Sequence, residues 1–259
     1  MFYNIVEIMH STKIELDNIS NIRDLYPIRN RDGMTIRRNR LFRSECLYRS
    51  SEDDMAILYE KCNLRKIIDL RTRSERLEKP DPSYRDIVCI DNPVQDEPYV
   101  GVTQDEESIR KRREYFRELD KKMLDDSFRE EHMCEFYGSL FKEEYALKGY
   151  ASFIDELLDS EDGVLWHCSL GRDRCGMATV LVLELLDVER ETIIEDYLYT
   201  NECLINPISI DYAYREYIEA FYRSIEENYG SIDNLFRVMG IDEGKKKRFK
   251  EKYLEVSHE

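Results

Sequence analysis

The fold follows from one segment of the chain, VLWHCSLGRDRCG at residues 164–176. Its first four residues, Val164–His167, form a short β-rich run, and the almost wholly apolar residues Gly176–Leu186 indicate a buried helix. The segment therefore predicts a strand, a tight loop and a helix, with Cys168 at the end of the strand.

Two other β-rich runs, Lys66–Leu70 and Ile87–Ile90, precede this one, and helical patterns separate all three. Strands that alternate with helices are typical of crossover units, in which the strands pair in parallel. We therefore expect an α/β fold with a central, mainly parallel sheet flanked by helices. The other expected elements are a short strand at Leu41-Phe42, a helix at Ser51–Cys62 capped by Ser51, and C-terminal helices near 189–203, 211–228 and 231–255, with caps at Ser231 and Asp242.

A highly charged segment lies between the second and third β-rich runs. Thr103–Glu131 has a helical pattern with one apolar stripe, and a second helix is expected around Met133–Phe141. We interpret about 103–147 as a helical insertion, which is either a solvated extension of the domain or a mobile lid over an active site. The 259 residues contain no repeat and no Gly/Ser linker, and their number is enough for one large α/β domain or two small ones.

Composition argues against several kinds of partner. The formal net charge is −16, and nonspecific nucleic-acid binding relies on basic surface, so no nucleic-acid partner is expected. No run of about 18 apolar residues offers a stable membrane anchor, and Met1–His10 does not resemble a signal peptide. We therefore expect a cytoplasmic protein, with secretion by a non-classical route left open.

The seven cysteines are odd in number and include no C-x-x-C pair, which argues against a disulfide framework or a structural zinc site.

The loop at 167–176 has three features that favour a bound anion. A loop leading into a helix N-terminus points several backbone N–H groups at one position, and Gly171 permits the turn that this needs. Arg174 lies six residues after Cys168, where its guanidinium can fork onto two phosphate oxygens. The same N–H groups and the helix dipole stabilise a thiolate. The segment thus indicates a cysteine nucleophile in a phosphate-binding loop.

The pattern His-Cys-x5-Arg, which stands here at His167–Arg174, resembles the signature of the protein tyrosine phosphatase superfamily. HCSLGRDRCG is more narrowly similar to the pattern His-Cys-x-x-Gly-Lys-Asp-Arg-Thr-Gly of the bacterial tyrosine/serine phosphatase family, which includes dual-specificity-like enzymes active on phosphotyrosine and phosphoinositides. The resemblance covers most of the chain and implies a protein tyrosine phosphatase-like fold in which residues 1–259 form a single phosphatase domain. Further segments that resemble the family are Asn21–Leu25, Leu41–Ser44, Ile68–Arg71 with Glu75, Tyr229–Ser231 with Leu235, and Gly240-Ile241.

The resemblance implies roles for the loop residues. Cys168 is expected to attack phosphorus and form a phosphocysteine, Arg174 to hold the phosphate oxygens, and Asp173 to protonate the leaving oxygen and later to activate water. Asp91 and Asp96 stay open as alternative acids. The residues expected to bind the substrate phosphate are Ser169, Leu170, Gly171, Arg172, Asp173 and Arg174. No metal or other cofactor is expected, because Arg174 and the N–H groups already neutralise the phosphate.

Supporting roles are expected for His167, Cys175, Asp69 and Arg71. The resemblance suggests that His167 orients the thiolate. Asp69 and Arg71, together with Glu75, either buttress the loop through ion pairs or touch the substrate.

Two positions depart from the family pattern. Arg172 replaces a Lys and keeps its charge, so its side chain is a candidate for recognising a second phosphate or an acidic substrate. Cys175 replaces a Thr or Ser whose hydroxyl helps the nucleophilic sulfur to leave, and a thiol is a weaker donor. Cys175 is therefore expected to slow phosphoenzyme hydrolysis, and it is also a candidate to trap an oxidised Cys168 as a disulfide.

We therefore expect a cysteine-dependent phosphoric monoester hydrolase, a protein tyrosine phosphatase that prefers phosphotyrosine, with activity on phosphoserine and phosphothreonine left open. Its substrate would be a phosphorylated protein or a phospholipid. One alternative is a phosphoinositide or inositol-polyphosphate phosphatase, which Arg172 favours mildly. A second is a phosphate-binding pseudo-phosphatase stalled by Cys175. A third is a sulfurtransferase, against which the His-Cys start and the Asp173-Arg174 pair argue.

Overall fold

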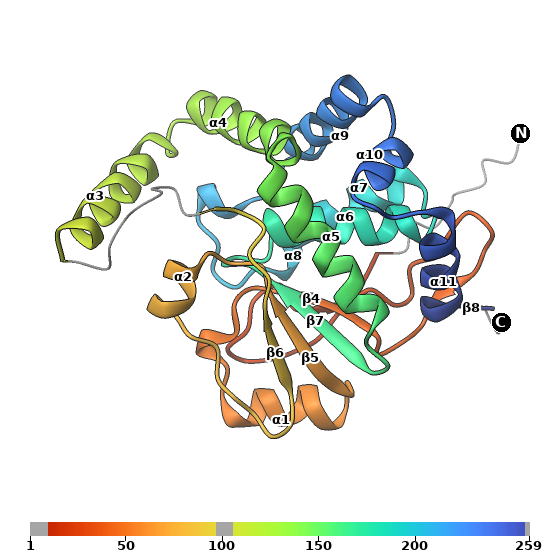
Figure 1. Ribbon diagram of the computed structural model, residues 1–259. Coiled ribbons are helices and arrows are strands. Elements are labelled where there is room, and N and C mark those ends of the chain that lie inside the picture. The colour runs from red at the N-terminus through yellow and green to blue at the C-terminus, as the bar shows by residue number, and fades with distance from the viewer. Residues whose placement is uncertain (1–9, 97–105, 257–259) are drawn as a thin grey trace, which may run out of the picture.

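The computed structural model describes residues 10–96 and 106–256. Its centre is a six-stranded sheet in the order β1-β2-β4-β7-β5-β6 (Figure 1). β7 (Gly163–His167) pairs in parallel with β4 (Leu41–Ser44) and with β5 (Leu64–Asp69), and β5 pairs in parallel with the edge strand β6 (Val88–Asp91). β1 and β2 add antiparallel pairs. The predicted α/β fold with a mainly parallel sheet is confirmed.

The remaining strands are β1 (Thr12–Lys13) and β2 (Arg23–Asp24), with β3 (Thr35–Ile36) and β8 (Leu254–Glu255) forming a separate two-stranded sheet. The helices are α1 (Glu52–Glu60), α2 (Arg73–Glu78), α3 (Glu106–Lys122), α4 (Asp126–Ser139), α5 (Glu144–Leu158), α6 (Arg174–Leu185), α7 (Arg190–Leu198), α8 (Thr200–Cys203), α9 (Arg215–Tyr229), α10 (Ile232–Val238) and α11 (Glu243–Tyr253).

Each face of the sheet buries its own core. Val164 and Trp166 of β7 belong to the larger core, which packs against α5, α6 and the C-terminal helices, whereas Leu165 belongs to the smaller core with Met55 and Leu58 of α1 (Figure 1). Successive side chains of a strand point to opposite faces. A one-residue slip of β7 would therefore turn its side chains toward the wrong cores, and the burial on both faces thus fixes the register of β7 and the position of its carboxyl end.

The helix caps agree with the sequence. Ser51 accepts a hydrogen bond from the backbone N–H of Asp54, and the Asp54 carboxylate accepts one from that of Ser51. Ser231 caps α10 and Asp242 caps α11, each through a side-chain oxygen that accepts one backbone N–H. These caps satisfy N–H groups that a helix leaves without an internal partner.

The predicted continuous helix at Thr103–Glu131 is wrong. Asp125 accepts a hydrogen bond from the backbone N–H of Phe128 at 2.9 Å and begins a new helix, so α3 ends at Lys122 and α4 runs from Asp126 to Ser139. Thr103 lies outside the described residues, as does the side chain of Ile109.

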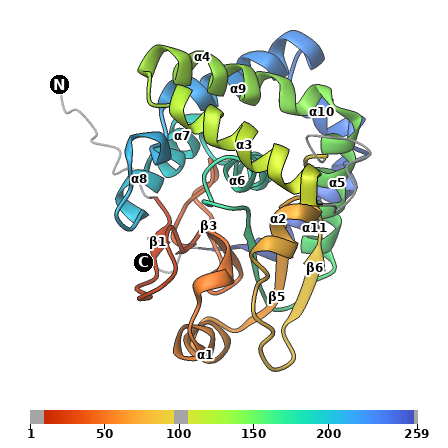
Figure 2. The ribbon, with the colours of Figure 1, turned by 90° about the vertical axis from the view of Figure 1, so that its left-hand side faces the viewer.

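The two helices α3 and α4, in the segment expected to be an insertion, pack against the rest of the structure to different degrees. α4 packs along α9 and buries Met133 and Tyr137, whereas α3 stands off the side of the body (Figures 1 and 2). Phe116 in α3 is largely exposed, and Leu119 is only partly buried. α4 is therefore anchored by its own core contacts, and movement of α3 as a lid stays a prediction. In the part of the chain that the structure describes, no helix combines the length and hydropathy needed to cross a bilayer.

Candidate active site

The candidate site lies where three parallel strands end together. Ser44, His167 and Asp69 are the last residues of β4, β7 and β5, and they are paired in register. Parallel strands present their carboxyl ends at one edge of a sheet, which is the usual position of ligand sites in such folds. The loop from Cys168 to Asp173 leaves this edge and leads directly into α6.

The backbone of this loop is held from behind. Three successive backbone carbonyl oxygens accept hydrogen bonds. That of Ser169 accepts from the Cys46 backbone N–H at 3.1 Å. Those of Leu170 and Gly171 accept from Asn21 Nδ2 at 3.2 Å and from Arg43 Nη2 at 2.7 Å, respectively. The C=O and N–H of a trans peptide point in opposite directions. These three bonds therefore favour a loop whose N–H groups turn to the other side, toward a common point.

Position 171 needs a glycine, both for its backbone conformation and because no room is left for a side chain. Its φ of +75° lies in the left-handed region, and a Cβ at this position would lie 2.3 Å from the carbonyl oxygen of Ser44. Any side chain would therefore push the loop away from β4. The turn expected of this glycine is confirmed.

Arg174 is clamped by Glu75 of α2. Glu75 Oε2 lies 2.6 Å from Arg174 Nη1, and Oε1 lies 2.7 Å from Nη2. Burial alone would raise the pKa of Glu75, but the Arg174 guanidinium outweighs it and holds that pKa well below its ordinary value. Ser169 Oγ also lies 3.3 Å from Arg174 Nη2. The guanidinium that the sequence directs at phosphate is thus fixed in one plane beside the loop.

Asp173 is a half-buried carboxylate, and both of its oxygens accept hydrogen bonds. It accepts hydrogen bonds from Arg172 Nε at 2.7 Å and Nη2 at 3.1 Å, and from the hydroxyl of Tyr137 in α4 at 2.7 Å. Burial favours the neutral acid, but Arg172 and Tyr137 together lower the pKa of Asp173. Tyr137 shares a further hydrogen bond with Tyr197 at 2.8 Å between their hydroxyl oxygens. Helix α4 therefore contacts the loop through one of its own side chains.

The Arg172 side chain faces inward. Besides Asp173, it donates to the backbone carbonyls of Ile210 at 2.6 Å and Tyr212 at 3.0 Å. With its guanidinium engaged inside the protein, its side chain does not face a position for a second phosphate. In this structure Arg172 instead joins the loop to the segment before α9.

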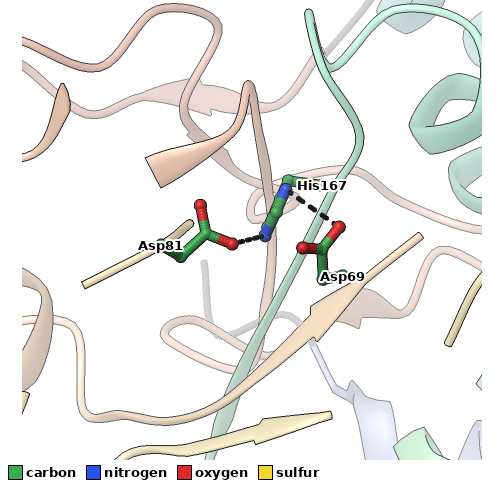
Figure 3. A group of neighbouring side chains, drawn as sticks. All are labelled: Asp69, Asp81 and His167. Carbon is green, nitrogen blue, oxygen red and sulfur yellow. Dashed lines mark ion pairs between the residues drawn. The ribbon is translucent and has the colours of Figure 1, made fainter. Parts of the chain in front are cut away.

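A cluster of charged groups underlies the loop at His167 (Figure 3). Asp81 Oδ2 lies 3.0 Å from His167 Nε2, and Asp69 Oδ1 lies 3.8 Å from Nδ1. Burial alone would lower the pKa of His167, but Asp69 and Asp81 outweigh it and raise that pKa. Arg71 Nη2 joins the two carboxylates, at 2.6 Å from Asp69 and 2.8 Å from Asp81. Of the readings left open, these contacts support the one in which Asp69 and Arg71 buttress the loop.

The same cluster has a donor set that metal ions use. Ligand atoms of Asp69, Asp81 and His167 lie within 4.8 Å of one another. However, Arg71 donates to both carboxylates, and Asp81 Oδ1 also accepts from the backbone N–H of Leu47 at 2.9 Å. A cation bound here would have to displace a guanidinium, so the arrangement fits an ion-pair cluster better than a metal site.

Cys168 and Cys175 are both buried and both free. Cys175 Sγ lies 3.5 Å from the carbonyl oxygen of Trp166, to which it donates. Burial raises the pKa of the Cys175 thiol to about 12, so this thiol stays neutral. Cys168 keeps 2% of its surface exposed, at the start of the loop.

The alternative acids lie in a different setting. Asp91 ends the edge strand β6, is exposed and pairs with Arg76 at 3.3 Å. Asp96 is the last described residue before the gap at 97–105. Of the three candidates, Asp173 is the one built into the loop.

Several residues of the site were not assigned a role from the sequence. Asp81, Tyr137, Asn21 and Arg43 all contact the loop or its supporting cluster. Asp81 had one local signal, because it stands between Pro80 and Pro82, which restrict the backbone on both sides. Asn21 and Arg43 also had a signal, because they stand in two of the segments that resemble the family, Asn21–Leu25 and Leu41–Ser44. Tyr137 comes from a distant segment, and its contact depends on the tertiary fold.

Comparison with known proteins agrees with this geometry. A protein of Cupriavidus necator that carries a provisional tyrosine-protein phosphatase name is 25% identical over 246 residues, which cover 86% of this chain and 82% of that protein. The triple specificity protein phosphatase PtpB of Mycobacterium tuberculosis is 28% identical over 116 residues, 34% of this chain and 42% of that protein. The model of the tyrosine phosphatase family matches residues 14–255, so the chain belongs to that family.

Proposed function

We propose that this phosphatase hydrolyses phosphomonoesters through a phosphocysteine at Cys168, with phosphotyrosine as its preferred substrate. One observation carries the proposal: the loop that starts at Cys168 has its carbonyls bound from behind and ends at an arginine clamped in one plane. Such a loop offers backbone N–H groups and a guanidinium to the same phosphate. Its first residue is a nucleophile of the right type.

The first step would transfer the phosphoryl group to sulfur. The Cys168 thiolate attacks phosphorus, the bond to the leaving oxygen breaks, and Asp173 gives that oxygen a proton. In the second step water attacks phosphorus, the P–S bond breaks, and Asp173 accepts the proton of the water. Arg174 and the loop N–H groups would stabilise the charge that builds on the phosphoryl oxygens in both steps.

The acid role of Asp173 requires that it gain a proton when substrate binds. Arg172 and Tyr137 favour its ionised form in the free protein. A phosphate dianion placed in the loop would oppose this, because a nearby like charge raises the pKa of a carboxyl group. We propose that substrate and proton therefore bind together.

The alternative substrates have different support. The inward-facing Arg172 removes the feature that favoured a phosphoinositide or inositol polyphosphate, although the name of the mycobacterial relative fits a broader range of phosphoesters. A stalled pseudo-phosphatase rests on Cys175, whose neutral, buried thiol is a poor substitute for a hydroxyl donor.

The test is turnover of phosphotyrosine, phosphoserine and phosphoinositide substrates by the wild type, by Cys168→Ser and by the matched control Cys89→Ser, which changes an exposed cysteine. We expect Cys168→Ser to lose on the order of 10³-fold or more in kcat and the control to keep its activity. Acid-quenched wild type should carry a phosphoryl group on Cys168, detected by mass spectrometry. Unchanged turnover by Cys168→Ser would refute the mechanism, and faster turnover of phosphoinositides would refute the substrate preference.

A further inference from the structure

Two arginines that the proposed chemistry does not use lie fully buried behind the phosphate loop. Arg23 of β2 and Arg43 of β4 have no exposed surface, and neither has Asp196 of α7, which lies between them. Asp196 Oδ2 is 3.4 Å from Arg43 Nη1 and 3.6 Å from Arg23 Nη2. Guanidinium groups in a dry interior normally meet an equal number of carboxylates, because an uncompensated buried charge is costly.

This cluster is not compensated by its own members. Two guanidinium groups against one carboxylate leave a formal net charge of +1. The neighbouring thiols Cys175 and Cys203 do not supply the missing charge, because burial raises the pKa of both. Within the described residues, the Nε atoms of Arg23 and Arg43 also lack a hydrogen-bond partner.

The excess charge lies next to the loop. Arg43 Nη2 donates to the carbonyl oxygen of Gly171 at 2.7 Å. Arg23 Nη1 donates to Asn21 Oδ1, and Asn21 in turn donates to the carbonyl oxygen of Leu170 at 3.2 Å. Both guanidinium groups are therefore tied to the backbone that surrounds the anion site.

Asp196 is fixed independently of the loop. Its Oδ1 accepts hydrogen bonds from the backbone N–H of Ser11, at 3.1 Å, and from the Ser11 hydroxyl. Its backbone carbonyl accepts from Arg23 Nη2 at 3.2 Å. The carboxylate thus holds both arginines while leaving one positive charge in excess.

We propose that Arg23 and Arg43 form a fixed, buried counter-charge for the Cys168 thiolate and for phosphate in the loop. The Asp196 carboxylate sets the net charge of this cluster. The inference rests on the proposed role of Cys168 as the nucleophile and adds positioning residues that never touch the substrate. Arg174 is held beside the loop by Glu75, whereas this pair reaches the carbonyl oxygens of the loop, Arg43 directly and Arg23 through Asn21. Because the pair is desolvated, its charge is screened less than that of a surface arginine.

Other ionisable groups also act on Cys168, so the test must separate them from Arg43. Those that interact with the thiol are Arg43 of β4, Arg174 and Cys175 of α6, and Tyr150 of α5, while His167 adjoins it in the chain. The variants below leave all of these in place except Arg43.

The test compares Arg43→Gln, which can still donate to Gly171 but has no charge, with Arg43→Lys, which keeps the charge. The readout is the rate of iodoacetamide alkylation at Cys168 against pH, with the modified peptide identified by mass spectrometry. We expect Arg43→Gln to move the midpoint of this profile up by about one pH unit or more, and Arg43→Lys to move it far less. Binding of inorganic phosphate should weaken about tenfold in Arg43→Gln.

A second variant gives a shift of opposite sign. Asp196→Asn removes the negative charge of the cluster, so the alkylation midpoint should move down. Arg190→Gln changes a half-exposed arginine that pairs with Glu226, and it should leave the profile unchanged. If Arg43→Gln does not fold, as judged by circular dichroism, Arg23→Gln carries the same test with a smaller upward shift.

A merely structural role predicts a different pattern. If Arg43→Gln and Arg43→Lys moved the midpoint equally, or if Arg43→Gln left it unchanged, the inference would be wrong. That failure differs from failure of the proposed function, since Cys168→Ser would still abolish turnover in the first case and would not in the second.

Discussion

Glu75 and Arg174 stand 99 positions apart in the sequence and form a doubly hydrogen-bonded ion pair, with N–O distances of 2.6 and 2.7 Å. The carboxylate is itself held, because its Oε2 accepts from the backbone N–H of Thr72 at 3.0 Å in a capping box at the start of α2. A short helix thereby fixes the plane of the guanidinium that the proposed chemistry directs at phosphate.

Glu75→Gln should weaken this alignment. An amide offers one oxygen and no charge, so Arg174 gains rotational freedom, and we expect kcat/KM to fall by about 10- to 100-fold. Steady-state kinetics with p-nitrophenyl phosphate measures the change. Glu78→Gln, at the end of the same helix, is the matched control and should stay close to the wild type. A Glu75→Gln enzyme of full activity would show that Arg174 does not need its clamp.

Asp81→Asn should destabilise the protein most between about pH 4 and 6.5. His167 has a raised pKa, so its contribution is complete below about 6.5 and is lost as the pH rises through the folded-state value. Asp81 has a lowered pKa, so its contribution is present above about 3.9 and is lost as the pH falls through its folded-state value. We expect a loss of about 3 kcal/mol in the window, measured by urea unfolding.

The matched control for this experiment is Asp86→Asn, which changes an exposed carboxylate. It should alter the free energy of unfolding by less than about 0.5 kcal/mol at any pH. A pH-independent loss in Asp81→Asn would mean that the cluster acts by packing and not by charge.

Tyr137→Phe should extend activity to higher pH. The Tyr137 hydroxyl donates to Asp173 and favours its ionised form, so its removal lets the pKa of Asp173 rise. If Asp173 is the acid, the pH at which kcat falls on the alkaline side of its pH profile should rise by about 0.5 to 1 unit. The substrate is phenyl phosphate, whose phenol is a poor leaving group and needs the proton. We call this fall the alkaline limb of the profile. Tyr197→Phe, which removes a hydroxyl bonded to Tyr137 and not to Asp173, should shift it less.

The same limb should be absent in Asp173→Asn, with or without the Tyr137 change. A Tyr137→Phe shift that persisted in the Asp173→Asn background would assign the proton transfer to another group. Asp91→Asn and Asp96→Asn would then be the variants to measure.

Oxidation of Cys168 should be trapped slowly at neutral pH. The sulfenic acid formed by peroxide would react with the Cys175 thiolate to give a disulfide and hydroxide. However, a thiol with a pKa of about 12 is only about 10⁻⁵ ionised at pH 7, so we expect the Cys168–Cys175 disulfide to form faster as the pH rises. Mass spectrometry after mild peroxide at pH 7 and 9 measures this. Over-oxidised Cys168 beside free Cys175 at both values would exclude the trap.

Much of the fold could be predicted because its determinants are local. The run Val164–His167 and the apolar stretch that follows encode a strand and a buried helix, and helix caps such as Ser51 are encoded within four residues. The break between α3 and α4 was missed although Asp125 is a local signal, because the charged helical pattern continues on both sides of it.

The strand–loop–helix segment and its residue types are encoded locally, since Cys168, Gly171 and Arg174 are close in the chain and their spacing can be read along it. Which distant groups act on these residues depends on the packing of the whole chain. Glu75 clamps Arg174, Tyr137 reaches Asp173, and the arginine pair reaches the loop from two other strands. These partners come from α2, α4, β2 and β4, which the tertiary fold packs around the carboxyl ends of the parallel strands, and no spacing along the chain records which of their side chains meet there.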